Sequence, residues 1–194
     1  MPVLLFGLFS VLFLLFPGMM VMDTDNITGK QMEVQRLIDN ANHHASFAII
    51  EEENAQGSVE LNFDEAMQRF HQRMLQNGVY TWDGTKYLPG EKSITKSPVY
   101  VSHRYLDYLQ WEGSYKMIVQ YKGSSLLESS FTKVADQGAT LEVEIRDHKG
   151  NIYTLPPKIV NGPSLISVAV VDDEGLGIAG KHTFPVLSVQ EVKR

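Results

Sequence analysis

The first 22 residues carry no charged side chain, so all 17 Lys and Arg and all 23 Asp and Glu of the 194-residue chain fall after residue 22. About 20 apolar residues in a helix rise about 30 Å, the thickness of a bilayer core. A transmembrane anchor from about Val3 to Met22 is one interpretation, and a cleaved signal peptide with its apolar core at Val3 to Phe16 is the other. No Lys or Arg precedes the run, which is unusual for a normal signal of either kind. No small-x-small triplet follows it, which argues against cleavage. We therefore favour the anchor and leave cleavage open.

The charges that flank this run predict an orientation in the membrane. The N-terminal amine is the one positive group before the run, and Asp23 and Asp25 follow it before Lys30. Positive charge stays on the cytoplasmic side of a membrane helix. We expect a single-pass protein with its N-terminus inside and its C-terminal domain extracytoplasmic.

Composition excludes several functional classes. The net charge of −6 disfavours binding to nucleic acid, which needs a basic surface. The chain has no Cys, so disulfides, thiolate metal sites and thiol catalysis are excluded. With 43% hydrophobic residues, the chain has enough apolar side chains to build a core.

After a polar, turn-prone bridge at 23–29, residues 30–54 have a helical pattern. Apolar residues recur there at steps of three and four and form one stripe, which consists of Val34, Ile38, Ala41, Ala45 and Ala48. The stripe fits a helix laid against the protein's own sheet. It also fits a helix that packs against other copies in an assembly, which makes these five residues the candidate interface.

The rest of the chain predicts one further helix and then strands. Residues 58–63 alternate as a short strand, Asp64 is placed to cap a helix, and Asn77-Gly78 is a helix stop. Hairpins are expected at 79–88 and 141–155, a strand buried on both faces at 165–171, and a last strand at 183–192 with Pro185 at an edge or a bulge.

The expected fold is α+β: an N-terminal transmembrane helix, an amphipathic helix, a second short helix and a mostly antiparallel β-sheet domain. The expected parts are the anchor or signal segment at 1–22, the membrane-proximal linker and amphipathic helix at 23–56, and the extracytoplasmic α+β domain at 57–194.

No motif indicates catalysis, so we expect no enzyme activity, no cofactor and no metal site. His43 and His44 are adjacent on a helix, so their side chains point about 100° apart and do not readily share one metal. The serines lack the glycine context of a nucleophile. The acidic run 172–174 fits either an ordinary acidic turn or a calcium site, and we leave that choice open. Tyr and Trp residues between 82 and 121 favour strand-face packing over a binding face.

Residues 41–78 resemble the membrane-proximal part of TadE-like, pilin-like proteins of the Tad (tight-adherence) pilus in Gram-positive bacteria. In that family a membrane helix leads into an Ala-containing helix, then a Gly-hydrophobic, Asp-Glu, Ala-x-x-x-Phe segment and a helix that ends near Asn. The matching positions here are Gly57, Asp64, Glu65, Ala66, Phe70, Leu75 and Asn77. Pilins usually carry a processing site, with an acid a few residues into the apolar helix. Gly7 is the conceivable processing residue here, but it is followed by Leu-Phe-Ser-Val-Leu, which contains no acid. The resemblance thus implies a membrane-resident minor component rather than a major filament subunit.

We therefore expect a non-enzymatic membrane protein that acts through protein contacts in a pilus- or secretion-type envelope assembly. Its expected partners are the membrane and other envelope or pilus-assembly proteins, including copies of itself. The alternative is a secreted or anchored extracytoplasmic module that binds a small ligand or a cell-wall component through the aromatic β region. An aromatic-lined pocket would favour this alternative.

Overall fold

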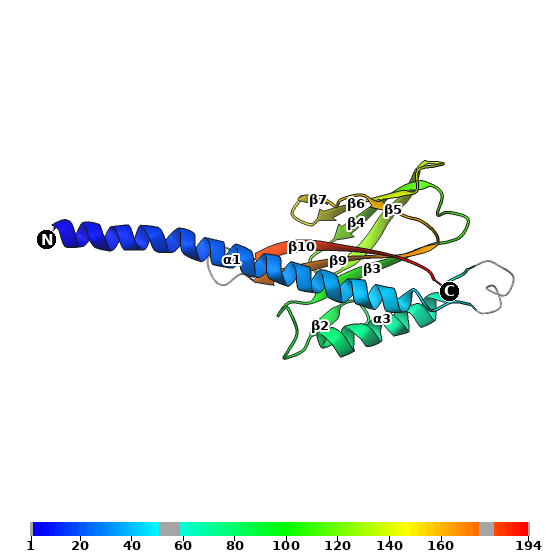
Figure 1. The fold of residues 1–194 in the computed structure, drawn as a ribbon, viewed down its shortest axis with the longest axis horizontal. Coiled ribbons are helices and arrows are strands. Elements are labelled where there is room, and N and C mark those ends of the chain that lie inside the picture. The colour runs from blue at the N-terminus through cyan, green and yellow to red at the C-terminus, as the bar shows by residue number, and fades with distance from the viewer. Residues whose placement is uncertain (1, 51–58, 175–180, 194) are drawn as a thin grey trace.

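Over the residues that the structure describes, the fold combines one very long helix, one short helix and two β-sheets (Figure 1). The computed structural model describes residues 2–50, 59–174 and 181–193, apart from the side chains of residues 2–5, 8, 12, 14, 16 and 174. The helices are α1 (Pro2–Ala45) and α3 (Phe63–Gly78). The strands are β1 (Tyr80–Trp82), β2 (Tyr87–Pro89), β3 (Val99–Leu106), β4 (Ser114–Tyr121), β5 (Leu126–Ala135), β6 (Thr140–Asp147), β7 (Ile152–Thr154), β8 (Lys158–Ile159), β9 (Ser164–Glu174) and β10 (Lys181–Glu191). The α+β class is confirmed.

Helix α1 is continuous over 44 residues, so the turn-prone bridge expected at 23–29 is wrong. Thr24 and Thr28 favour turns when their hydroxyls bond locally to non-helical backbone. Here their hydroxyls donate to the carbonyls four residues earlier, Met20 O and Thr24 O, each at 2.9 Å, which is compatible with a helix. Ile27 also packs against the core, so tertiary contact supports the helix through this segment. The helix ends at Ala45 rather than near Asn54.

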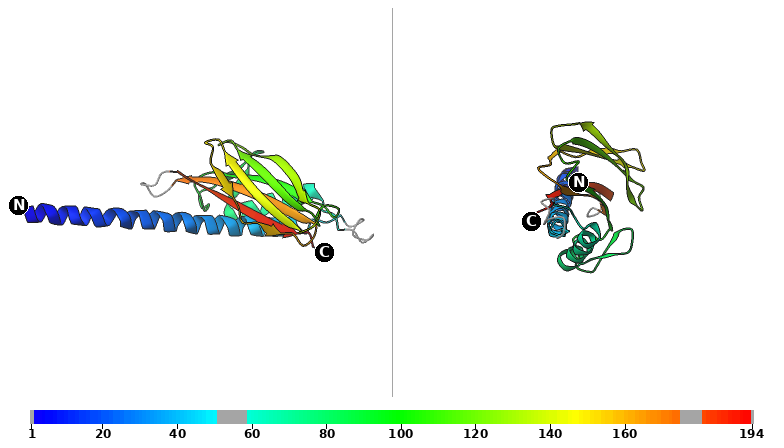
Figure 2. Two further views of the ribbon diagram at one scale, coloured as in Figure 1. Left: turned by 90° about the horizontal axis from the view of Figure 1, so that it is seen from above. Right: turned by 90° about the vertical axis from the view of Figure 1, so that its right-hand side faces the viewer.

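The strands form two sheets rather than the one sheet expected from the sequence. The first sheet has the order β1-β2-β3-β9-β10 and is antiparallel throughout. The second has the order β5-β4-β6-β7, with β8 also paired to β6, and contains one parallel pair, β4 with β6. Helices α1 and α3 lie on one side of the first sheet and the second sheet lies on the other, which gives three layers (Figure 2).

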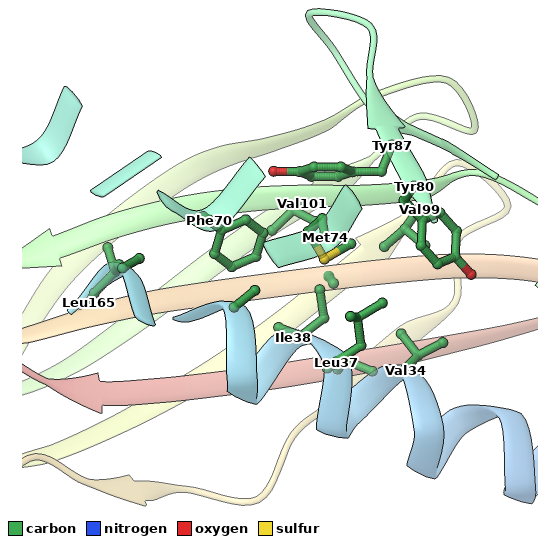
Figure 3. Close-up of a cluster of buried hydrophobic side chains, with 14 of the residues drawn as sticks. Val34, Leu37, Ile38, Phe70, Met74, Tyr80, Tyr87, Val99, Val101 and Leu165 are labelled. Carbon is green, nitrogen blue, oxygen red and sulfur yellow. The ribbon is translucent and has the colours of Figure 1, made fainter. Parts of the chain in front are cut away.

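Strand β9 contributes to both cores, which confirms the prediction of a strand buried on both faces. Leu165, Ala169 and Val171 belong to the core between the helices and the first sheet (Figure 3). Ile166, Val168 and Val170 belong to the core between the two sheets. Because neighbouring side chains of a strand point to opposite faces, a continuous apolar run indicates burial on both sides.

Helix α3 begins differently from its prediction. Asn62 is its N-cap, and its side-chain oxygen accepts a hydrogen bond from the backbone N–H of Glu65 at 3.2 Å, so the capping role assigned to Asp64 is wrong. Leu61 forms a single β-bridge with Ile49 in place of the short strand expected at 58–63. The end of the helix at Gly78 is confirmed.

Both predicted hairpins are present. Strands β1 and β2 pair through Trp82 and Tyr87, and β6 and β7 pair on either side of the turn after Asp147. Pro185 lies in β10, which is an edge strand of the first sheet, as predicted.

Gly78 is required for helix packing rather than for backbone conformation. A Cβ atom at this position would lie 2.4 Å from Leu37 Cδ2 and 2.8 Å from Tyr80 Cδ2. The left-handed residue that ends α3 is instead the next one, Val79, with φ of 57°. The absence of a side chain at Gly78 therefore lets α3 approach α1 closely.

We predict that Gly78→Ala destabilises the fold by about 1–3 kcal/mol, because the added methyl overpacks the contact with Leu37. The matched control is Gly29→Ala in α1, where an added Cβ meets no atom within 4 Å. This control should stabilise the protein by about 0.5–1 kcal/mol through helix propensity. Urea unfolding measures both changes, and equal effects of the two substitutions would contradict the packing role.

Candidate functional site

The N-terminal half of α1 projects away from the β-sheet domain (Figures 1 and 2). Its exposed apolar side chains are Phe6, Phe9, Val11, Phe13, Leu15, Met19, Met20, Val21 and Met22. Residues two apart on a helix point to nearly opposite sides, so Phe9 and Val11 lie on different faces, as do Phe13 and Leu15. Phe13 is 81% exposed. This half of the helix is apolar all round, which is typical of a helix surrounded by other apolar groups.

Ser10 is the one residue with a hydrogen-bonding side chain in the sequence from residue 2 to residue 22. Its hydroxyl donates to the carbonyl oxygen of Phe6 at 2.9 Å. Because the backbone of α1 is helical here, most of its N–H and C=O groups are also bonded within the segment. The exceptions are the N–H groups of the first turn and the carbonyl four residues before Pro17, which has no N–H to donate. Elsewhere the projecting half meets its hydrogen-bonding needs internally, as a segment surrounded by hydrocarbon must.

Among the residues and side chains that the structure describes, no helix meets the length and hydropathy needed to cross a membrane.

The helix joins the domain between Asp23 and Lys30. Asp23 is buried, and Ile27 packs against the first core. The Lys30 ammonium contacts a carboxylate oxygen of Asp173 at 2.5 Å, and Asp173 is 1% exposed. This ion pair joins α1 to the end of β9.

The five candidate interface residues, Val34, Ile38, Ala41, Ala45 and Ala48, are 0% exposed. They lie in the core that α1 forms with α3 and the first sheet, where Figure 3 shows Val34 and Ile38 beneath Phe70 and Met74. Four of the five residues therefore lie on the face with which α1 packs on its own domain, and Ala48 follows the end of the helix at Ala45. A partner could reach this face only if α1 left the sheet.

A buried polar network fixes α1 on the sheet beside this stripe. The Asn42 side-chain amide donates to Leu165 O at 2.9 Å and to Ser188 Oγ at 3.1 Å. Its oxygen accepts from Ser167 Oγ at 2.9 Å, and Ser167 Oγ lies 2.9 Å from His103 Nδ1. Burial lowers the pKa of His103 to about 3, so this imidazole is neutral at neutral pH and serves the core.

Helix α1 also covers part of the outer edge of the first sheet. The side-chain amides of Gln31 and Gln35 donate to the carbonyls of Pro185 and Leu187 in β10, at 3.4 and 3.0 Å. An unpaired edge strand is a template for pairing with another chain. At β10 these two carbonyls are already bonded to the helix.

The acidic run 172–174 has structural partners. Asp172 accepts hydrogen bonds from the Tyr121 hydroxyl at 2.8 Å and from the Thr183 hydroxyl at 2.5 Å, and Asp173 pairs with Lys30. The rest of the loop considered for calcium, residues 175–180, lies outside the described residues. Over the described part of the chain, no three His, Asp or Glu side chains are grouped so that they could hold a metal ion.

The aromatic side chains of the β region pack mainly within the two cores. Tyr100 and Tyr121 contact each other between the sheets, and the Tyr115 ring stacks on Phe131. Tyr108 is an exception at 53% exposed. The predicted strand-face packing is confirmed for these buried rings.

Sequence reasoning missed a polar groove between α1 and α3. The groove has a volume of about 340 Å³ and is lined by Asn40, His43, His44, Arg73 and Asn77. The sequence places His43 and His44 side by side but gives no sign that Arg73 faces them from the other helix. A helix-pairing prediction for residues 34–45 with 66–78 could have found it.

Comparison with protein-family models, with curated proteins and with solved structures finds no match to this chain. The class of protein therefore rests on the structure: an α+β domain with a helix layer and two sheets, and a long helix whose apolar half projects from it.

We predict that Lys30→Met destabilises the protein by about 1–3 kcal/mol, because the buried carboxylate of Asp173 loses its cation. The control is Lys133→Met, which removes an ion pair to the exposed Asp136 and should leave stability unchanged. Denaturant titration of both variants gives the free energies of unfolding that test this prediction. A Lys30→Met protein as stable as the control would show that the ion pair does not hold α1 to β9.

Proposed function

We propose that this protein is a non-enzymatic, single-pass membrane protein that acts through protein contacts as a pilin-like or accessory subunit of an envelope assembly. The observation that carries the proposal is the unbroken helix α1, with one half packed on the domain and the other half projecting and apolar on all sides. This half would be stable in a bilayer or among the apolar helices of other subunits.

The dimensions support the anchor. Residues 2–22 at about 1.5 Å per residue span about 31 Å, which matches the hydrocarbon core of a bilayer. The first charged residue, Asp23, and the first core contact, Ile27, follow directly after this length. The flanking charges favour an N-terminus inside and an extracytoplasmic domain.

The architecture is compatible with the TadE-like resemblance. Of the matching positions, Asp64 and Glu65 lie in the first turn of α3, and Ala66 and Phe70 are buried in the first core. Gly57 lies outside the described residues. Ala66 and Phe70 serve the docking of α3, whereas Asp64, Leu75 and Asn77 are exposed. The resemblance therefore favours a similar helix arrangement and no particular chemistry.

The anchor is tested by the double substitution Val11→Lys and Phe13→Lys in the full chain. Each Lys at the centre of a membrane helix costs about 2.5–3.5 kcal/mol, so the double variant should leave the membrane fraction after carbonate washing. The control is Met32→Lys, an exposed methionine in the packed half of α1, which should stay with the wild type. A double variant that remains in the membrane would refute the anchor.

The intact mass of the protein from a Gram-positive host tests processing. A full-length mass in the membrane fraction supports the proposal. A secreted product that starts near residue 23 would instead favour the alternative of a soluble binding module. Cleavage after Gly7 would show processing as in pilins.

The assembly part of the proposal is tested by photo-crosslinking in intact cells from a probe at Phe13, which is exposed on the projecting half. We expect adducts with other copies of the chain or with pilus- or secretion-type envelope proteins. A probe at the buried Val34 is the control and should give no adduct. Adducts with lipid alone at Phe13 would contradict contacts along the helix.

A further inference from the structure

The groove between α1 and α3 gathers polar side chains from two helices. Asn40 and His44 are four residues apart on α1, and Arg73 and Asn77 are four residues apart on α3, so each pair lies on one face of its helix. The close contact of Gly78 with Leu37 brings the two faces together at one end of the groove. The volume of about 340 Å³ is that of a small-ligand site.

The charge in this groove is positive and lacks a counterion among the described residues. Arg69, one turn before Arg73, donates two hydrogen bonds to Glu65, at 3.0 and 2.5 Å. Arg73 has no ion pair with any described residue, although it is only partly exposed. An arginine is always charged, so the groove holds a cation in a chain of net charge −6.

The pKa of His44 reflects the excess of positive charge around the groove. Burial lowers the pKa of His44 below its ordinary value, and the charges of Arg73, Arg69 and His43 lower it further. These charges come from both α1 and α3. Of the carboxylates on the same two helices, Glu65 is paired with Arg69 and Asp39 accepts a hydrogen bond from the Gln35 side chain. No described carboxylate raises its pKa.

We propose that this groove is a binding site for an oxyanion, a carboxylate or a phosphate, with Arg73 as its main charge partner. The guanidinium presents paired N–H donors that match the two oxygens of such a group. The imidazoles of His43 and His44 and the side-chain amides of Asn40 and Asn77 supply further donors around it. The site does not depend on the proposed membrane anchor.

The position of the groove separates it from the apolar half of α1. Met22 and Asn40 are 18 residues apart on one helix, which is about 27 Å. With residues 2–22 in a bilayer, as proposed above, lipid headgroups beside residue 22 would be out of reach of the groove. This part of the inference rests on the proposed anchor and favours a dissolved anion as the ligand.

The test follows the pKa of His44 by NMR of its ring Cε1–Hε1 resonance in the full chain, held in an uncharged detergent. The His44→Gln variant assigns the resonance. Sodium phosphate and sodium acetate are titrated separately, with sodium chloride at matched ionic strength. Since a bound anion favours the charged imidazole, we expect the bound oxyanion to raise the pKa of His44, with tighter binding at lower pH. The anion that binds more tightly identifies the class of ligand.

Two variants distinguish anion binding in the groove from a general effect of added salt on the pKa of His44. Arg73→Gln should weaken binding of the preferred anion at least tenfold. Arg146→Gln, in β6 of the second sheet, removes the same charge away from the groove and should bind like the wild type. The proposal is overturned if neither anion shifts the pKa of His44, if chloride shifts it equally, or if the two variants bind alike. Thermal unfolding confirms that both variants fold.

Discussion

The structure depends on the packing of the second half of α1 against β9 and β10. Ala41 and Ala45 have small side chains, which let the helix lie close to the sheet. Asn42 is the polar exception on this surface, and its three hydrogen bonds to β9 and β10 fix the position of the helix along the strands. A buried amide without these partners would cost about 1–3 kcal/mol, so a displaced helix is disfavoured. Helix α3 then packs against α1 through Gly78.

The continuity of α1 couples the projecting half to the domain. One helix spans both, and the hydroxyls of Thr24 and Thr28 bond within it where a turn-prone bridge was expected. The ion pair of Lys30 with Asp173 restrains the helix where it leaves the sheet. A subunit anchored in this way would hold its domain in a fixed orientation relative to whatever surrounds residues 2–22. This is a useful property in the proposed assembly, because contacts made by the helix also position the domain.

Local patterns in the sequence predicted much of the fold, while long-range pairing was outside their reach. The apolar run 165–171 and the alternation at 141–145 correctly predicted β9 and β6, because burial on one or two faces leaves a direct signature. Strand alternation does not reveal the neighbour, so the parallel pairing of β4 with β6 and the division into two sheets were missed. Strand β5 was missed because its residues are mostly exposed and mixed in polarity. The groove was missed because it also depends on long-range pairing: Arg73 comes close to His44 only after the two helices have packed.

The burial of the small-residue stripe changes where this protein can meet its partners. A surface that holds α1 on its own sheet is unavailable for assembly, because exposing it would remove the core that defines the domain. Two features that remain exposed in the described part of the chain are of opposite chemistry: apolar side chains between Phe6 and Met22, and the cationic groove at 40–44 and 73–77. They lie on one helix, separated by about 27 Å. Hydrophobic contact is non-directional and would provide most of the binding free energy, whereas an arginine-centred anion site provides selectivity through geometry. In the proposed assembly, affinity and selectivity would therefore lie at different ends of α1, and the continuous helix would keep the two ends in a fixed relation.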